Sequence, residues 1–168
     1  KLLSEVPDVR IDKVEEINKK AVEIAKSASK GMKDKFVALS IGPGTKLASL
    51  GHTSYNTLYN QYKVQIEAGK EADIFLIETA QDLLQIKAAI NACKEVDSKK
   101  PIIVSFTIEQ SNTLLTGSDI SAVATLMRNY DIFALGLNCA MGPDLMKKPL
   151  ELLHKSWGGR LYLSSNAG

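Results

Sequence analysis

The sequence predicts an α/β fold, a partial (β/α)₈ TIM barrel of about five consecutive βα units. Five apolar runs of strand length are continuous rather than alternating, as expected for parallel strands that are buried on both faces. Their first residues recur roughly every 28 to 38 positions, which is the length of one βα unit. Every run is also followed by polar or small residues, at the position where barrel proteins carry their sites.

The apolar runs and the segments between them alternate in a regular order. The runs lie at residues 36–41, 74–77, 102–106, 132–137 and 161–163. Apolar residues at helical spacing occupy the other segments, at residues 14–24, 58–66, 83–90, 120–126 and 145–153. The predicted order is therefore αβαβαβαβαβ across residues 1–168, without a linker or a second domain.

Capping residues support three of the predicted helices. Thr53 or Ser54, and Asp119, are of the types that accept hydrogen bonds at a helix N-terminus. Pro143 follows Gly142 at the start of the last helix, where a missing backbone N–H is tolerated. These residues place the helix starts in the loops that follow the strands.

The choice between a barrel and an open parallel sheet depends on where the polar residues fall. Both folds build their sites at the carboxyl ends of the strands, but an open sheet uses mainly the loops at its switch point. Here five successive strand ends carry such groups: Gly42-Pro43-Gly44-Thr45, Glu78-Thr79-Ala80-Gln81-Asp82, Thr107, Asn138-Cys139 and Asn166-Ala167-Gly168. We therefore favour the mouth of a barrel.

Composition excludes several classes of protein. The 168 residues are 45% hydrophobic and 24% charged, with a net charge of +2 and no basic patch, so we expect no nucleic-acid partner. No apolar stretch approaches the roughly 20 residues of a membrane span, and no signal peptide opens the chain. We expect a soluble cytoplasmic protein without a membrane partner. Cys93 and Cys139 are too few for a disulfide framework, and both are expected to be reduced.

Two side chains at strand ends are candidates for metal binding, substrate binding or catalysis. Cys139 follows a buried strand, where a thiol is placed for metal binding or nucleophilic chemistry, although a small core residue is the common alternative. Glu78 also follows a strand, where its carboxylate could hold an ammonium group or act as an acid or base. The alternative for Glu78 is a carboxylate at a helix N-terminus, a role that suits Asp82 better.

Other candidates have ordinary structural explanations. The segment Gly42-Pro43-Gly44-Thr45-Lys46 lacks the spacing of a phosphate loop and is expected to form a turn. His52 and His154 lack the spacing partners of a metal site, and Cys93 falls on a predicted helix face where it would pack.

The motifs along the chain resemble the homocysteine S-methyltransferase family, and most of all its cobalamin-dependent methionine synthase members. They occur in the family's order along nearly the whole chain: Ser40-Ile41-Gly42-Pro43, Leu50-Gly51-His52, Ile77-Glu78-Thr79 with Gln81-Asp82, Leu115-Thr116-Gly117-Ser118-Asp119, Ala134 to Pro143, and Asn166-Ala167-Gly168. The stretch Gly136-Leu137-Asn138-Cys139-Ala140-Met141-Gly142-Pro143 is the specific one.

The resemblance implies zinc-dependent transfer of a methyl group to the thiol of homocysteine, forming methionine. It makes Cys139 the first of three zinc thiolates, and Asn166 a group that occupies the open zinc position until the substrate thiol displaces it. By the same resemblance Glu78 grips the amino group of homocysteine, and Asn138 helps to shape the substrate site. Ser165 departs from the proline common in the family, which we expect to loosen the placing of Asn166.

By the same resemblance, the chain is an internal piece of a longer protein. The five runs correspond to barrel strands three to seven, so residues 1–168 form an incomplete homocysteine-binding barrel. The two remaining zinc cysteines belong to a Gly-Gly-Cys-Cys-Gly motif that this chain lacks. Cobalamin, or a domain that carries methylcobalamin, is expected elsewhere in the parent protein, although the methyl donor is left open.

Physical reasoning limits what the isolated chain is expected to do. Five βα units leave two unpaired sheet edges, so the chain should self-associate or fold as an open five-stranded sheet. One thiolate binds zinc weakly, so the isolated chain is expected to be inactive. Two alternatives stay open: a metal-independent barrel enzyme that uses Glu78 as a base, and a non-catalytic remnant that keeps only the fold.

Overall fold

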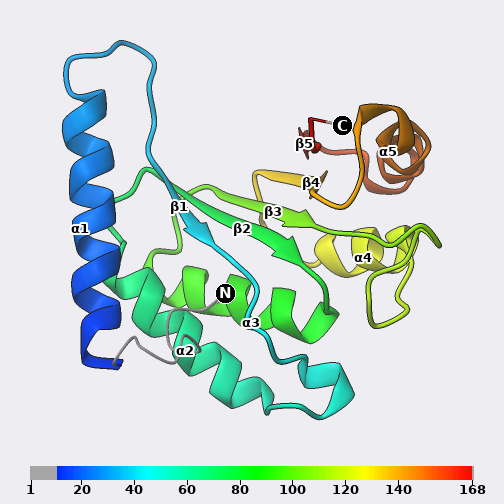
Figure 1. Ribbon diagram of the computed structural model, residues 1–168, viewed down its shortest axis with the longest axis horizontal. Helices are drawn as coiled ribbons and strands as arrows, with labels where there is room; N and C mark the ends of the chain where they lie inside the picture. Colours follow the sequence, from blue (N-terminus) through cyan, green and yellow to red (C-terminus); the bar gives the residue numbers. More distant parts are fainter. Residues whose placement is uncertain (1–10, 168) are drawn as a thin grey trace.

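The computed structural model describes residues 11–167 (Figure 1). Its elements follow the alternating order that the sequence predicts, with one short 3₁₀ helix added. In chain order they are α1 (Ile11–Ser29), β1 (Ala38–Ile41), η2 (Ala48–Leu50), α2 (Tyr55–Ala68), β2 (Ile74–Ala80), α3 (Leu83–Val96), β3 (Ile102–Phe106), α4 (Ile120–Met127), β4 (Ala134–Asn138), α5 (Pro143–Trp157) and β5 (Leu161–Ser164).

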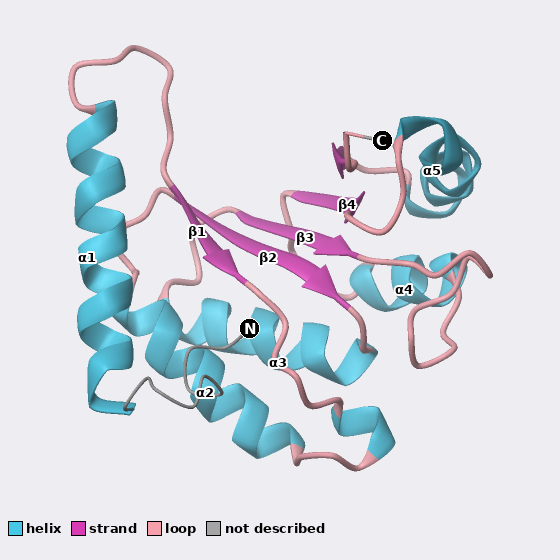
Figure 2. Cartoon of the chain, viewed as in Figure 1, coloured by secondary structure: helices cyan, strands magenta, loops and turns pink. Residues whose placement is uncertain are grey.

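The strands form one parallel sheet in the order β1-β2-β3-β4-β5. Each strand therefore lies beside its predecessor, and the order never reverses as it would in a doubly wound sheet. Because βα crossovers are right-handed, this order places the helices on one side of the sheet, which is how they lie in Figure 2. The result is an arc of a (β/α) barrel, as the sequence predicts.

The hydrophobic core lies between the sheet and these helices. Alternate residues of β2 and β3 point toward it, among them Phe75, Ile77, Val104 and Phe106, each at most 3% exposed. Leu76 and Ile103 point to the other face and are partly exposed. The sheet is thus covered on one face, and its other face would be the interior of a closed barrel.

Side-chain caps start the helices where the sequence predicts. The hydroxyl of Ser54 accepts a hydrogen bond from the Thr57 backbone N–H at 3.0 Å. Asp119 caps α4 in the same way, through the Ala122 N–H at 2.7 Å. Helix α5 begins at Pro143, directly after Gly142.

Two strands have bounds that differ from the predicted ones. Strand β1 begins at Ala38 rather than at residue 36, because the Val37 N–H donates to the Asp73 carboxylate at 2.8 Å and Phe36 is 72% exposed. Strand β2 continues through Glu78 to Ala80, past the end of its apolar run. The extension contains an irregularity in the β2–β3 register between Ile77 and Ala80.

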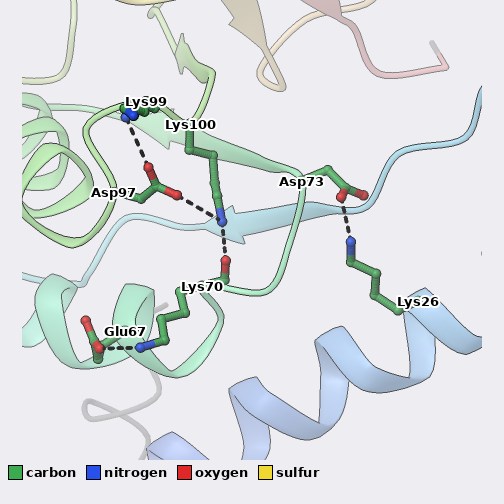
Figure 3. A network of polar contacts seen from close by, with 7 residues as sticks. All are labelled: Lys26, Glu67, Lys70, Asp73, Asp97, Lys99 and Lys100. Atoms are coloured by element: carbon green, nitrogen blue, oxygen red, sulfur yellow. Dashed lines mark hydrogen bonds and ion pairs between the residues drawn. The ribbon is translucent and has the colours of Figure 1, made fainter.

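Charged side chains at the amino ends of the strands pair with one another (Figure 3). Lys26 on α1 contacts Asp73 at 2.5 Å, and Lys100 contacts the Lys70 backbone carbonyl and lies 3.8 Å from Asp97. A cavity of about 690 Å³ opens at this end, and Asp73, Asp97 and Lys100 are among its walls. These charges hold the turns between helices and strands, at the end of the sheet opposite the predicted site.

Candidate functional site

A polar cluster joins the carboxyl ends of β2, β3 and β4. Its centre is Asn138, the last residue of β4, which is only 3% exposed. Thr79 reaches it from β2 and Ser105 from β3, and Cys139 follows it directly. The cluster thus gathers side chains that are far apart in the sequence at the edge where the sequence predicts the site.

The amide of Asn138 has a partner on every side. Its Oδ1 accepts hydrogen bonds from the Thr79 backbone N–H at 3.0 Å and from the Ser105 hydroxyl at 2.6 Å. Its Nδ2 donates to Thr79 Oγ1 at 2.7 Å and toward Cys139 Sγ at 3.2 Å. The Thr107 hydroxyl donates to the Asn138 backbone carbonyl at 3.0 Å. This network rigidifies the three strand ends relative to one another.

The backbone on both sides of the cluster adopts left-handed conformations. Thr79 has φ of 62°, and Cys139 and Ala140 have φ of 59° and 58°. A left-handed β-branched residue is rare, because its Cβ substituents crowd the backbone, and such residues gather at functional sites. The bend at Thr79 falls within the register irregularity of β2 and turns its N–H toward Asn138.

Cys139 is the accessible thiol of this cluster. Its side chain is partly exposed, and its Sγ lies 3.8 Å from Thr79 Oγ1. Its backbone N–H donates to the Ser164 carbonyl at 3.1 Å, which fastens the loop to β5. Cys93, by contrast, is buried on α3, and burial raises the pKa of its thiol well above the ordinary value. The two cysteines therefore have different roles, and Cys93 packs as the sequence predicts.

Glu78 lies inside β2 rather than in the loop after it. Its side chain is partly exposed, and the Ser40 hydroxyl on β1 donates a hydrogen bond to its Oε1. Glu78 directly precedes Thr79, so the carboxylate lies on the same strand end that contributes Thr79 to the cluster. Asp82 takes the structural role expected for it, capping α3 through the Leu84 N–H and also binding the Ser49 N–H.

Asn166 meets the loop that follows Cys139. Its backbone N–H donates to the Met141 carbonyl at 3.2 Å, and its side chain is exposed. The structure thus brings the C-terminal segment to the same mouth as β4. Asn138, in contrast, is enclosed by protein groups, and direct contact between its amide and a substrate stays a prediction.

Within the described residues, the cluster offers zinc a single thiol ligand. Cys139 offers a soft, partly exposed thiol sulfur, the ligand type that zinc prefers. Within residues 11–167 no group of three or more His, Cys, Asp or Glu side chains could hold a metal ion. His52 accepts a hydrogen bond from the Leu47 N–H at 3.4 Å, in the loop before α2. Further thiolate ligands would have to come from beyond the described residues.

The sequence places Thr79 and Thr107 among the polar groups at the strand ends, but it does not single out Ser105 or show that these residues bond to Asn138. A signal was present, because polar residues close the apolar runs of three consecutive strands at comparable positions. The left-handed turn at Thr79 had no such signal, since threonine is a residue type that avoids it.

The fold and the cluster together define a barrel-type α/β protein with a thiol at the mouth formed by its strand ends. A family model described as homocysteine S-methyltransferase matches residues 5–168. The chain belongs to the homocysteine S-methyltransferase family.

Individual relatives agree with this membership. The chain is 33% identical over 179 residues to the methionine synthase of Mycobacterium tuberculosis and 34% identical to that of Mycobacterium leprae. Each match covers 99% of this chain but only 15% of the relative. The chain therefore spans about a seventh of the length of these proteins.

Solved structures show the same fold. The apo form of the homocysteine methyltransferase MmuM from Escherichia coli matches with a TM-score of 0.83 and 23% identity, over 97% of this chain and 64% of that one. Its metallated form matches with a TM-score of 0.79 and 24% identity, over 92% and 59% of the two chains.

Proposed function

We propose that this chain is part of the homocysteine-binding barrel of a methionine synthase, which transfers a methyl group to the thiol of homocysteine. The observation that carries the proposal is the partly exposed Cys139 thiol, held by Thr79 and Asn138 at the carboxyl ends of the strands. Family membership and the similarity to two methionine synthases support it.

The proposal includes zinc as the cofactor of this site. Cys139 would supply one thiolate ligand, with two more from beyond this chain, and Asn166 would lie at the open position. Bound zinc lowers the pKa of a thiol that reaches it, which supplies a thiolate nucleophile at neutral pH. The metallated form of the E. coli relative supports a metal in this fold.

The chain's own residues would bind and orient the substrate. Glu78 holds the ammonium group of homocysteine, while the Ser40 hydroxyl, which donates to its Oε1, keeps the carboxylate in place. Asn138 contributes to substrate binding by placing Thr79 and Cys139, and the Gly42-Pro43 turn lines the mouth. The substrate sulfur then attacks the donor methyl group, so that a carbon–sulfur bond forms while the bond from the methyl group to its donor breaks.

The methyl donor and its carrier complete the proposal. Similarity to the methionine synthases favours methylcobalamin, carried on another domain of the parent protein. We place the reaction in the cytoplasm. None of the helices within residues 11–167 is both long and apolar enough to cross a membrane. The isolated chain is proposed to be inactive, because it contributes one of the three thiolates.

Replacing Cys139 in the complete protein tests the proposal. Cys139→Ala should lower the zinc content, measured by mass spectrometry of metals, and abolish methionine formation from homocysteine. Cys93→Ala is the matched control, because that thiol is buried on α3, and it should leave both quantities unchanged. Unchanged zinc content in Cys139→Ala would contradict the assignment. Activity that survives Cys139→Ala but not Glu78→Gln would favour a metal-independent enzyme with Glu78 as the base.

A further inference from the structure

We propose that Thr79 and Asn138 form a clamp that positions the Cys139 sulfur. Within the proposed function, the clamp sets how strongly the site holds its metal. The inference rests on the proposed role of Cys139, but the clamp itself is a property of the protein without metal. Neither residue touches the substrate in this proposal, so both are positioning residues.

The hydrogen-bond partners of Asn138 determine the orientation of its amide. Its oxygen and nitrogen differ in what they can bind, and the Thr79 backbone N–H can only donate. The atom that receives this hydrogen bond at 3.0 Å is therefore the oxygen. The nitrogen must then face the other way, toward Thr79 Oγ1 at 2.7 Å and Cys139 Sγ at 3.2 Å. The backbone of β2 thus determines that the sulfur receives an N–H donor.

The Asn138 side chain has little freedom to rotate. Both amide protons and both acceptor positions are used, and the Ser105 hydroxyl that completes the set is fully buried. Turning the amide toward the mouth would break its hydrogen bonds together, including the buried one from Ser105, which is costly. The amide is therefore held as part of the protein rather than free to follow a ligand.

The Thr79 hydroxyl is the second group that contacts the sulfur. Its oxygen accepts from Asn138 Nδ2, so its own proton is available to the sulfur, which lies 3.8 Å away. The left-handed backbone of Thr79 brings this hydroxyl and the N–H that orients Asn138 into one small space. One residue with a left-handed backbone thus supplies both contacts.

The backbone N–H of Cys139 already ties the loop to the Ser164 carbonyl, and the clamp orients the sulfur that this loop carries. Cys139 and Ala140 both have left-handed backbones, so the loop is sharply bent at the point where the thiol leaves β4. Groups that contact a metal ligand in this way orient it, and losing one lowers metal affinity about ten- to a hundredfold. We expect a loss of this size when either clamp residue is replaced.

Paired variants of the complete protein test the clamp. Thr79→Val keeps the branched shape but removes the hydroxyl, and Asn138→Asp keeps the shape but removes the N–H donors. Zinc affinity, measured by competition with a coloured chelator, should fall about ten- to a hundredfold in both. Thr79→Ser restores the hydroxyl and should return the affinity to within about threefold of the parent. Thr125→Val, at an exposed position on α4, should leave it unchanged.

A second measurement uses metal-free protein and does not depend on zinc binding. Iodoacetamide alkylation of Cys139, followed by peptide mass spectrometry, is measured at the high-pH plateau, where protonation no longer limits the rate. Donors at a thiolate hold its lone pairs, so Thr79→Val and Asn138→Asp should react at least about threefold faster than the parent, and Thr79→Ser should not. Thermal unfolding identifies a variant that does not fold. If either Thr79→Val or Asn138→Asp fails to fold, the folded one of the two tests the clamp.

The two measurements separate the clamp from the proposed function. Folded Thr79→Val and Asn138→Asp proteins with parental zinc affinity and parental alkylation rate would overturn the clamp. A parent protein that binds no zinc would overturn the proposed function, and the alkylation rates alone would then decide whether the clamp exists.

Discussion

At the scale of single residues, the site depends on backbone conformations that side-chain chemistry alone does not indicate. The sequence places Glu78 and Cys139 at the ends of the second and fourth strands. The structure places Glu78 inside β2, near its carboxyl end, and Cys139 directly after β4. The Cys139 sulfur is contacted by Thr79, whose backbone is left-handed, and by the enclosed amide of Asn138. An asparagine at the end of a strand, such as Asn138, is expected to form hydrogen bonds at the site. Its partners are contributed by two other strands and therefore depend on the register of the sheet.

The role of Glu78 can be tested through the substrate's amino group. A charge-assisted hydrogen bond stabilises a complex by roughly 1.5–3 kcal/mol, which is about a ten- to hundredfold effect on binding. In the complete protein, Glu78→Gln should therefore raise the KM for homocysteine by about that factor with a smaller change in kcat. Steady-state kinetics measures both parameters.

A substrate analogue supplies the control for Glu78. 4-Mercaptobutyrate lacks the amino group, so the parent and Glu78→Gln should use it equally poorly. Equal KM values of the parent and the variant for homocysteine itself would show that another group binds the ammonium.

At the scale of secondary structure elements, local signals explain most of the architecture. Capping by Ser54 and Asp119, and the proline at the start of α5, define helix starts through contacts within a few residues. Strand bounds are less local. Strand β1 starts late because Val37 binds the Asp73 side chain, 36 residues away in the sequence. The end of β2 lies beyond its apolar run because a bulged strand can continue through polar residues.

The ion pair between α1 and the turn before β2 makes stability depend on pH. The hydrogen bond from Lys26 is the main reason that the pKa of Asp73 lies below its ordinary value, and the Val37 N–H adds to the effect. A lowered pKa in the folded state stabilises the protein above the carboxyl's ordinary pKa. That contribution is lost as pH falls through the folded-state value.

Asp73→Asn removes this charge and keeps an oxygen that can accept from Val37. At pH 6 the variant should be less stable by about 0.2–1 kcal/mol, the range of a partly exposed pair. The difference should shrink as pH falls below the ordinary pKa of the carboxyl and through its lowered folded-state pKa, because the parent side chain then becomes neutral as well. Urea unfolding over a series of pH values measures the difference. Glu23→Gln, in the exposed pair with Lys20, should show little change, and a difference at Asp73 that does not shrink as pH falls would contradict the explanation.

At the scale of the whole molecule, strand order is the feature that identifies the fold. The repeated βα units predict parallel strands, and the polar residues at five successive strand ends indicate a barrel mouth. The structure confirms a sheet in sequential order, covered by helices on one side. Closure of the barrel involves pairings beyond these five strands, so no local pattern in this chain could determine it.

The two outer strands lead to a prediction about the isolated chain. Within residues 11–167, strands β1 and β5 each pair on one side only, and Leu161 and Leu163 of β5 are 38% and 44% exposed. Apolar side chains beside unpaired backbone groups form a template for another strand. We therefore expect the isolated chain to form dimers or larger species at tens of micromolar, measured by sedimentation velocity over a range of concentrations.

A charge placed on this edge should prevent the association. Leu163→Lys puts an ammonium group beside the unpaired side of β5, where a second chain would have to bury it, so the variant should sediment as a monomer. Leu152→Lys is the matched control, because Leu152 is similarly exposed at 39% but lies on α5, and that variant should still associate. A parent chain that is monomeric at these concentrations, with slow hydrogen exchange in both β1 and β5, would show that the two edges are protected within a single molecule.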